Sequence, residues 1–106
     1  MPTYLIINRL PAGYRPSPAA AGLWTAWFDE LGDHLVDRGN PVFTRQSLGT
    51  ESNTLLGGYT LVTAADLSAA VQLARNCPAM REGGGVEIGE LTLLNAGTGP
   101  AATAPN

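Results

Sequence analysis

Apolar and polar positions along this chain are spaced in a way that predicts four strands and two helices. Residues 3–9 and 55–62 are compact runs of aliphatic, branched and aromatic side chains, which are the types that suit a pleated strand. Tyr4 and Ile6 alternate with Leu5 and Ile7, so apolar groups project from both faces of the first strand. Both runs are therefore expected to be covered on two sides.

Two further strands are predicted with weaker patterns. Residues 41–48 have a strand-like composition that Thr44 and Arg45 interrupt, which favours an edge position. Residues 86–94 resume the alternation, and we expect Gly89 to form a bulge that shifts the register between Ile88 and Leu91. The inward side of this strand is predicted to consist of Val86, Ile88, Leu91 and Leu93.

Helical spacing marks two other segments. Ser17 and Pro18 are a typical helix start, and Gly39 is a suitable stop. Between them an apolar stripe is expected to anchor the core, and it comprises Ala20, Trp24, Trp27, Phe28, Leu31 and Leu35. The second helix is capped by Thr63 or Asp66 and ends before Pro78. Its apolar face comprises Leu67, Ala70, Val71 and Ala74.

The predicted order is strand, helix, strand, strand, helix, strand, which is the ferredoxin-like β-α-β-β-α-β arrangement of an α+β fold with a four-stranded antiparallel sheet. We expect one domain over residues 1–95 and a disordered tail over 96–106, because the tail has no apolar periodicity. Both helices would cover one face of the sheet. Since the strands are apolar on both faces, we predict a homodimer closed through the open face.

Composition and charge exclude several classes of protein. The 106 residues include no lysine and six scattered arginines, and the net charge is −3, so a clustered basic face for nucleic acid is not expected. The single cysteine, Cys77, cannot form an internal disulfide and leaves a metal site without its usual ligands. No stretch is long and apolar enough for a membrane span, so we expect a cytoplasmic protein. We also expect neither a cofactor nor a metal.

A few residues could carry chemistry. His34 has Glu30 four positions before it and Asp37 three positions after it, so a carboxylate could orient its ring as a general base. The alternative is a half-buried histidine at the border of the apolar stripe, without catalytic function. Cys77 lies at a helix C-terminus, where a nucleophilic thiolate is not expected.

Ligand-binding candidates gather near the proline-rich loop that follows the first strand. Asn8 and Arg9 end that strand, and the planar guanidinium of Arg9 or Arg45 could hold a carboxylate or phosphate. Trp24 could line the same cleft. The alternatives are surface ion pairs for the arginines and a core position for the tryptophan.

The sequences and the order of several segments resemble the YCII-related domain family, which includes the DGPF proteins. The resemblance rests on GGYTLV at 57–62, ADLSAAVQLARNCP at 65–78, the following VEI strand, the tryptophans of the first helix, and the run Asp37, Gly39, Pro41. It covers Tyr4 to Leu94 and implies a dimeric α+β barrel. Enzyme-like members resemble chloro-hydroxyhydroquinone dehydrochlorinase, with a proposed His–Asp pair. Their histidine lies early in the first helix, whereas the only histidine here is His34.

Two functions follow from these observations. The first is a small dimeric binding or accessory domain that holds a small molecule without catalysis. The second is an acid–base enzyme of the lyase type, acting on a small aromatic or related substrate through His34 with Asp37 or Glu30. The two differ in whether His34, a carboxylate and one of the two arginines, Arg9 or Arg45, share a concave site.

Overall fold

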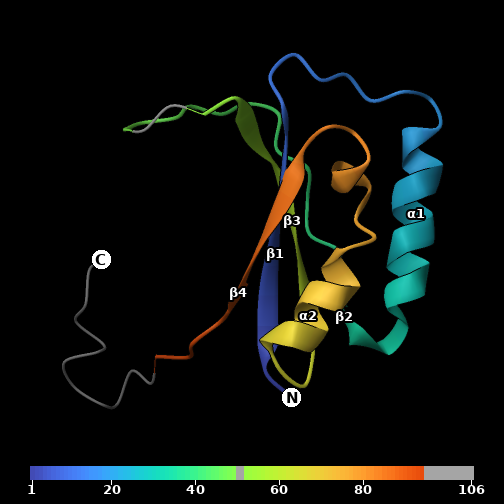
Figure 1. Cartoon of the computed structure of the whole chain (residues 1–106), viewed down its shortest axis with the longest axis vertical. Helices are drawn as coiled ribbons and strands as arrows, with labels where there is room; N and C mark the ends of the chain where they lie inside the picture. Colours follow the sequence, from blue (N-terminus) through green and yellow to red (C-terminus); the bar gives the residue numbers. More distant parts are fainter. Residues whose placement is uncertain (50–51, 95–106) are drawn as a thin grey trace.

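A computed structural model describes residues 1–49 and 52–94 as one α+β unit (Figure 1). The predicted tail at 96–106 lies outside the described residues. The order of elements is β1 (Thr3–Pro11), α1 (Ala20–Leu31), the short 3-10 helix η1 (Gly32–His34), β2 (Leu35–Asp37), β3 (Thr54–Thr63), α2 (Leu67–Ala74), the short 3-10 helix η2 (Pro78–Met80) and β4 (Gly85–Glu90).

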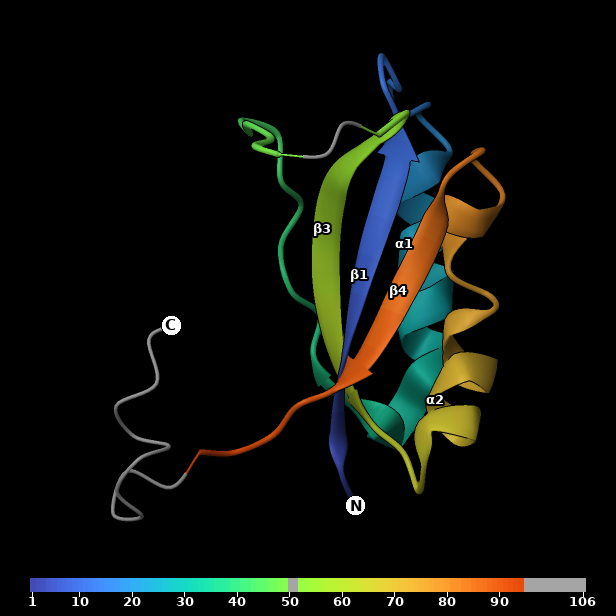
Figure 2. The ribbon, with the colours of Figure 1, turned by 60° about the vertical axis from the view of Figure 1, so that its left-hand side comes forward.

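The strands form an antiparallel sheet in the order β2-β3-β1-β4. Both α-helices cover one face of this sheet, and no helix among the described residues lies on the other face (Figures 1 and 2). The predicted β-α-β-β-α-β order and fold class are confirmed. In the single chain the sheet is open and does not close into a barrel.

The core lies between the sheet and the helices. Tyr4 and Ile6 of β1 are 1% exposed, and their neighbours Leu5 and Ile7 are half-buried on the opposite face. Val62 of β3 is buried on the helix side in the same way. The two-faced strands predicted from the sequence are therefore present. The helices close the core with four buried side chains, namely Trp27, Leu31, Ala70 and Ala74.

Helix α2 begins as predicted. The Oδ1 atom of Asp66 accepts a hydrogen bond from the backbone N–H of Ala69 at 2.8 Å, which satisfies one of the free donors of the first turn. Helix α1 lacks such a side-chain cap. Its first residue, Ala20, donates its N–H to the backbone carbonyl of Ser17 instead of the hydroxyl.

Helix α1 ends at Leu31, well before the predicted stop at Gly39. Gly32 has a φ of 54° and turns the chain, and Leu35 joins β2, where it pairs with Val62. Leu35 therefore reaches the same core as the helical stripe, but from the sheet. Apolar spacing alone does not distinguish these two ways of burying one side chain.

The second strand lies at 35–37, and the prediction of a strand over 41–48 was wrong for most of that range. Within it, Pro41 forms a single bridge to Gly58, and Val42 donates its N–H to the carbonyl of Gly57 at 3.0 Å. Gly39 makes this crossing possible, because a Cβ there would collide with the carbonyl of Tyr59. After Val42 the chain leaves the sheet.

The last strand ends at Glu90, and its predicted bulge is absent. Gly89 pairs in register with Leu5, whereas the sheet is irregular between β1 and β3, opposite Asn8 and Arg9, and between β2 and β3, at Leu35 and Asp37. Val86 and Ile88 pack on the core as predicted. Leu91 and Leu93 do not, since they follow the strand and are 41% and 95% exposed.

Candidate functional site

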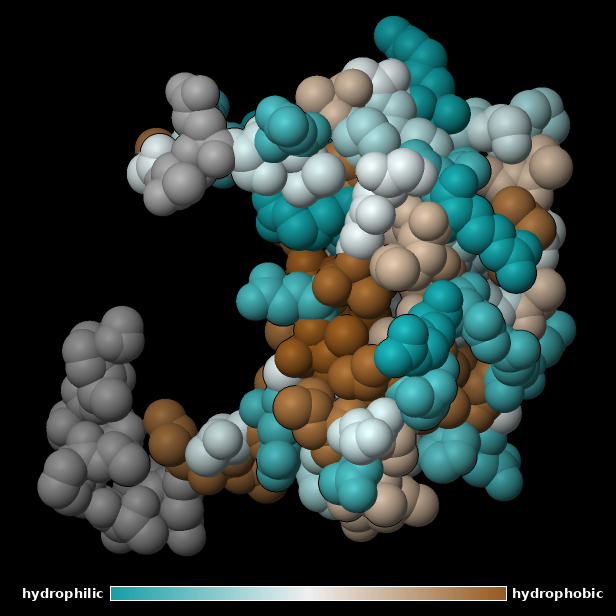
Figure 3. Space-filling view, in the orientation of Figure 1, coloured by the Kyte–Doolittle hydropathy of each residue, from teal (hydrophilic) through white to brown (hydrophobic). Residues whose placement is uncertain are grey.

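The open face of the sheet carries a continuous row of apolar side chains. Ile7 is paired with Tyr59, and Leu5 is paired with Leu61, so these four side chains are cross-strand neighbours on one face. All four are half-buried. Figure 3 shows hydrophobic residues gathered in the middle of the molecule, between two segments that project on the side away from the helices.

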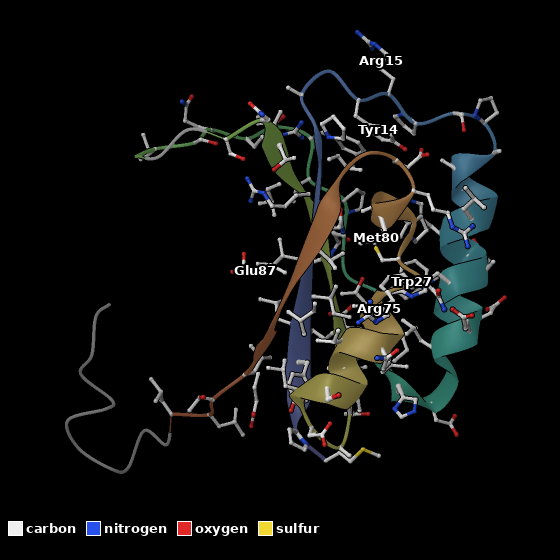
Figure 4. The ribbon with its side chains drawn as sticks, in the orientation of Figure 1. Tyr14, Arg15, Trp27, Arg75, Met80 and Glu87 are labelled. Atoms are coloured by element: carbon white, nitrogen blue, oxygen red, sulfur yellow. The ribbon has the colours of Figure 1, made fainter. Side chains whose placement is uncertain are left out.

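A hollow of about 190 Å³ opens on this face beside Gly89. Its apolar lining consists of Leu5, Ile7, Ile88 and Leu91, and two acidic residues, Glu87 and Glu90, line it as well. The hollow exists because Gly89 has no side chain, and an added Cβ would meet no atom within 4 Å. Glu87 points away from the helices in Figure 4 and is paired with Ile7, so its carboxylate lies on the same side of the sheet as the apolar row. Such a surface can hold an apolar molecule and contact one polar group on it.

The predicted ligand-binding residues Asn8 and Arg9 lie on opposite faces of β1. Asn8 is directed to the helix side and is 6% exposed. Arg9 is on the open face and is held there by Thr54, whose hydroxyl accepts from Nε at 2.9 Å and whose carbonyl accepts from Nη2 at 3.0 Å. Adjacent residues of a strand point in opposite directions, so they do not meet at one ligand.

Arg45 and Trp24, the other two predicted ligand-binding residues, lie on other parts of the fold than Asn8 and Arg9. Nη1 of Arg45 donates to the carbonyl of Val42 at 2.8 Å, within its own loop. Trp24 is half-buried on α1, where its ring meets Trp27 edge to face with centroids 5.8 Å apart. The structure therefore does not gather the four predicted ligand-binding residues around one cavity, and their part in binding stays a prediction.

His34 is fixed by the sheet. Its Nδ1 lies 2.9 Å from the carbonyl oxygen of Thr63. A carbonyl only accepts, so this nitrogen carries the proton and Nε2 is left as the acceptor of the neutral ring. The carboxylates are engaged elsewhere. Asp37 accepts from the N–H of Gly39 at 2.8 Å, and Glu30 accepts from Asn76 at 3.1 Å. No hydrogen bond joins His34 to either carboxylate in the described residues, and the catalytic role of His34 and Asp37 stays a prediction.

Two other polar groups are explained by packing. The hydroxyl of Tyr14 donates to Glu82 at 2.7 Å and ties the proline-rich loop to the segment before β4. Burial is the main cause that raises the pKa of Tyr14, and the hydrogen bond to the Glu82 carboxylate is the second. Burial raises the pKa of the Cys77 thiol to about 11. A thiol with this pKa is protonated at neutral pH and is a poor nucleophile.

Sequence reasoning missed the hollow because Gly89 was interpreted as a bulge. The signal was the unbroken alternation of VEIGEL at 86–91, which places Glu87 and Gly89 together on one face. In the described residues, no three His, Cys, Asp or Glu side chains come together in a way that could hold a metal ion. Residues 1–49 and 52–94 also include no helix that is long and apolar enough to cross a membrane.

Comparison with models of protein families and with curated proteins finds no match for this chain. The resemblance to the YCII-related family therefore stays a prediction that rests on the sequence segments given above.

Proposed function

We propose that this chain is a homodimeric cytoplasmic domain of the YCII-related type that binds a small, largely apolar molecule on the open face of its sheet without transforming it. The observation that carries the proposal is the row formed by Leu5, Ile7, Tyr59 and Leu61 together with the hollow beside Gly89. Small-molecule sites are typically lined by apolar side chains with a few polar groups that fix orientation. Here Glu87 supplies such a group.

The homodimer follows from the same face. Contiguous apolar patches of this kind are rare on monomers, because each exposed apolar group is favoured to leave water. A second copy would cover the row and enclose the hollow between two sheets. A ligand held there would be shielded from water on both sides. The dimeric α+β barrel implied by the family resemblance is the same arrangement.

Binding without catalysis is favoured by the groups that face the hollow. Acid–base catalysis needs a base within hydrogen-bond reach of the proton that it removes. His34 donates to Thr63 from the edge of the sheet at β2 and β3, and the hollow lies at β1 and β4. A mainly apolar hollow lined also by Glu87 and Glu90, with no histidine among its lining residues, is suited to retention of a ligand.

The test uses N-phenyl-1-naphthylamine, an uncharged dye whose fluorescence rises in apolar surroundings. We expect saturable binding to the full chain, and we expect Gly89→Leu to weaken it at least about tenfold, since the new side chain fills the hollow. Gly22→Leu is the matched control, because Gly22 also has nothing within 4 Å of an added Cβ but lies on α1. Equal affinity of the two variants for the dye, or no saturable binding by the wild type, would contradict the proposed site.

A further inference from the structure

Two segments that leave the sheet flank its open face. The first is residues 42–49, here called the arm, which departs after the bridge at Pro41. The second is residues 91–94, here called the extension, which continues from β4. Figures 1 and 2 show both on the side away from the helices, the arm near one end of the sheet and the extension near the other.

Both segments expose large apolar side chains. In the arm, Phe43 is 75% exposed and Leu48 is 90% exposed. In the extension, Leu93 is 95% exposed and Leu94 is 60% exposed. A single exposed apolar residue needs no explanation, but here several sit on two segments at the margins of one apolar sheet face. They could be buried together by one partner that lies against that face.

The area of the sheet indicates why such segments are needed. β2 has three residues, whereas β1, β3 and β4 have nine, ten and six, so at about 3.3 Å per residue and about 4.8 Å between strands the projected face is roughly 450 Å². A stable protein–protein interface buries about 800 Å² on each partner. The sheet alone falls short of this area, and the arm and the extension are the adjoining surfaces that can add to it.

The charges of the face suit a second copy of the same chain. On the open side of the four strands the charged side chains are Arg9, Glu87 and, at the β2 edge, Asp37, which follow from the strand registers. Both signs are present, so Arg9 of one copy can face a carboxylate of the other when two such faces are brought together by a two-fold axis. A strongly charged partner would gain little from this surface.

We propose that the arm and the extension clasp a second copy of this chain, burying Phe43, Leu48, Leu93 and Leu94 against it. This inference rests on the proposed homodimer and adds which residues hold it together. Each partner supplies one arm and one extension, so in a two-fold dimer every substitution removes its contact twice. The contribution of the arm to the free energy of dimerisation is therefore doubled, and its factor in the dissociation constant is squared.

The experiment measures the dissociation constant of the full-length chain by sedimentation equilibrium. The wild type is expected to dimerise at micromolar concentrations. The double variant Phe43→Ser with Leu48→Ser is expected to raise the dissociation constant by about a hundredfold, a tenfold loss at each of two symmetric contacts. The matched control is Leu67→Ser with Met80→Ser, which alters two apolar residues of 51% and 48% exposure on the helix side of the chain.

Circular dichroism and thermal melts establish that each variant is folded, as expected for substitutions at exposed positions. An unchanged dissociation constant for the arm variant, with the wild type dimeric, would overturn the clasp and leave the homodimer in place. A wild type that stays monomeric would overturn both. An equal weakening by the control variant would also overturn the clasp, because the loss would then not depend on the open face.

Discussion

Substitution of Trp27 by phenylalanine tests the placement of the core. The side chain of Trp27 is 2% exposed, and its Nε1–H donates to the carbonyl of Leu73 at 3.1 Å, which links α1 to α2. Phenylalanine keeps an aromatic ring but removes the donor and part of the ring volume. The loss of the indole donor to this part-buried carbonyl costs about 1–3 kcal/mol, and the space left by the smaller ring adds about 1 kcal/mol.

We therefore expect Trp27→Phe to lower the free energy of unfolding by about 2–4 kcal/mol, a large part of the roughly 5–15 kcal/mol of a typical domain. The assay is urea denaturation followed by far-ultraviolet circular dichroism, which does not depend on tryptophan emission. Trp24→Phe is the matched control, because Trp24 is half-buried and no hydrogen bond from its ring is present in the described residues. It is expected to cost less than about 1.5 kcal/mol.

A loss for Trp27→Phe that does not exceed the loss for Trp24→Phe would refute this reasoning. It would mean that the hydrogen bond between α1 and α2 contributes nothing, or that the two tryptophans exchange roles in solution. Both variants must be compared at a protein concentration where the oligomeric state is the same, because dimerisation stabilises the folded chain by mass action.

Two further predictions concern the backbone and the buried thiol. Gly39→Ala should lower the free energy of unfolding, measured by urea denaturation, by more than about 2 kcal/mol, since it adds strain at a φ of 76° to a collision with the carbonyl of Tyr59. The control Gly49→Ala, at a φ of 86° in open space, should lower it by only about 1 kcal/mol. Equal losses for the two variants would contradict the close approach of Gly39 to Tyr59. Because the pKa of Cys77 is raised to about 11 in the folded chain from 9.0, the unfolded thiol loses its proton first, so stability should fall between these pH values. Cys77→Ala should remove this part of the pH dependence, and a wild-type profile that parallels the variant would contradict it.

Three of the four strands and the two helices could be predicted because their local patterns agree with the tertiary arrangement. Tyr4, Ile6 and Val62 are buried as the alternation requires, and Asp66 caps α2 as its side chain allows. The errors arose where two different local conformations of the chain would bury the same side chain. Leu35 continues the helical stripe in sequence, yet the glycine at position 32 turns the chain and lets it enter the core from β2.

Candidate chemistry was harder to predict than the fold, because a motif gives separation along the chain and not the face on which a residue lies. Asn8 and Arg9 are adjacent in sequence and point to opposite sides of β1. Asp37 is three residues from His34, but the chain there is a short strand and not a helix. The helical spacing that would place the carboxylate beside the ring therefore does not apply.

Gly89 shows how one glycine decides between two interpretations of a strand. A bulge would move Leu91 and Leu93 to the core and fill the inner face. A regular register instead ends the strand at Glu90 and releases the leucines to the open side. The side of the sheet that faces the helices is covered without these leucines, because Val86 and Ile88 already pack against the core. The surplus apolar residues then lie outside the fold of one chain, and they stabilise it only if something else covers them. The unbulged register thus links the hollow, the extension and the proposed second copy.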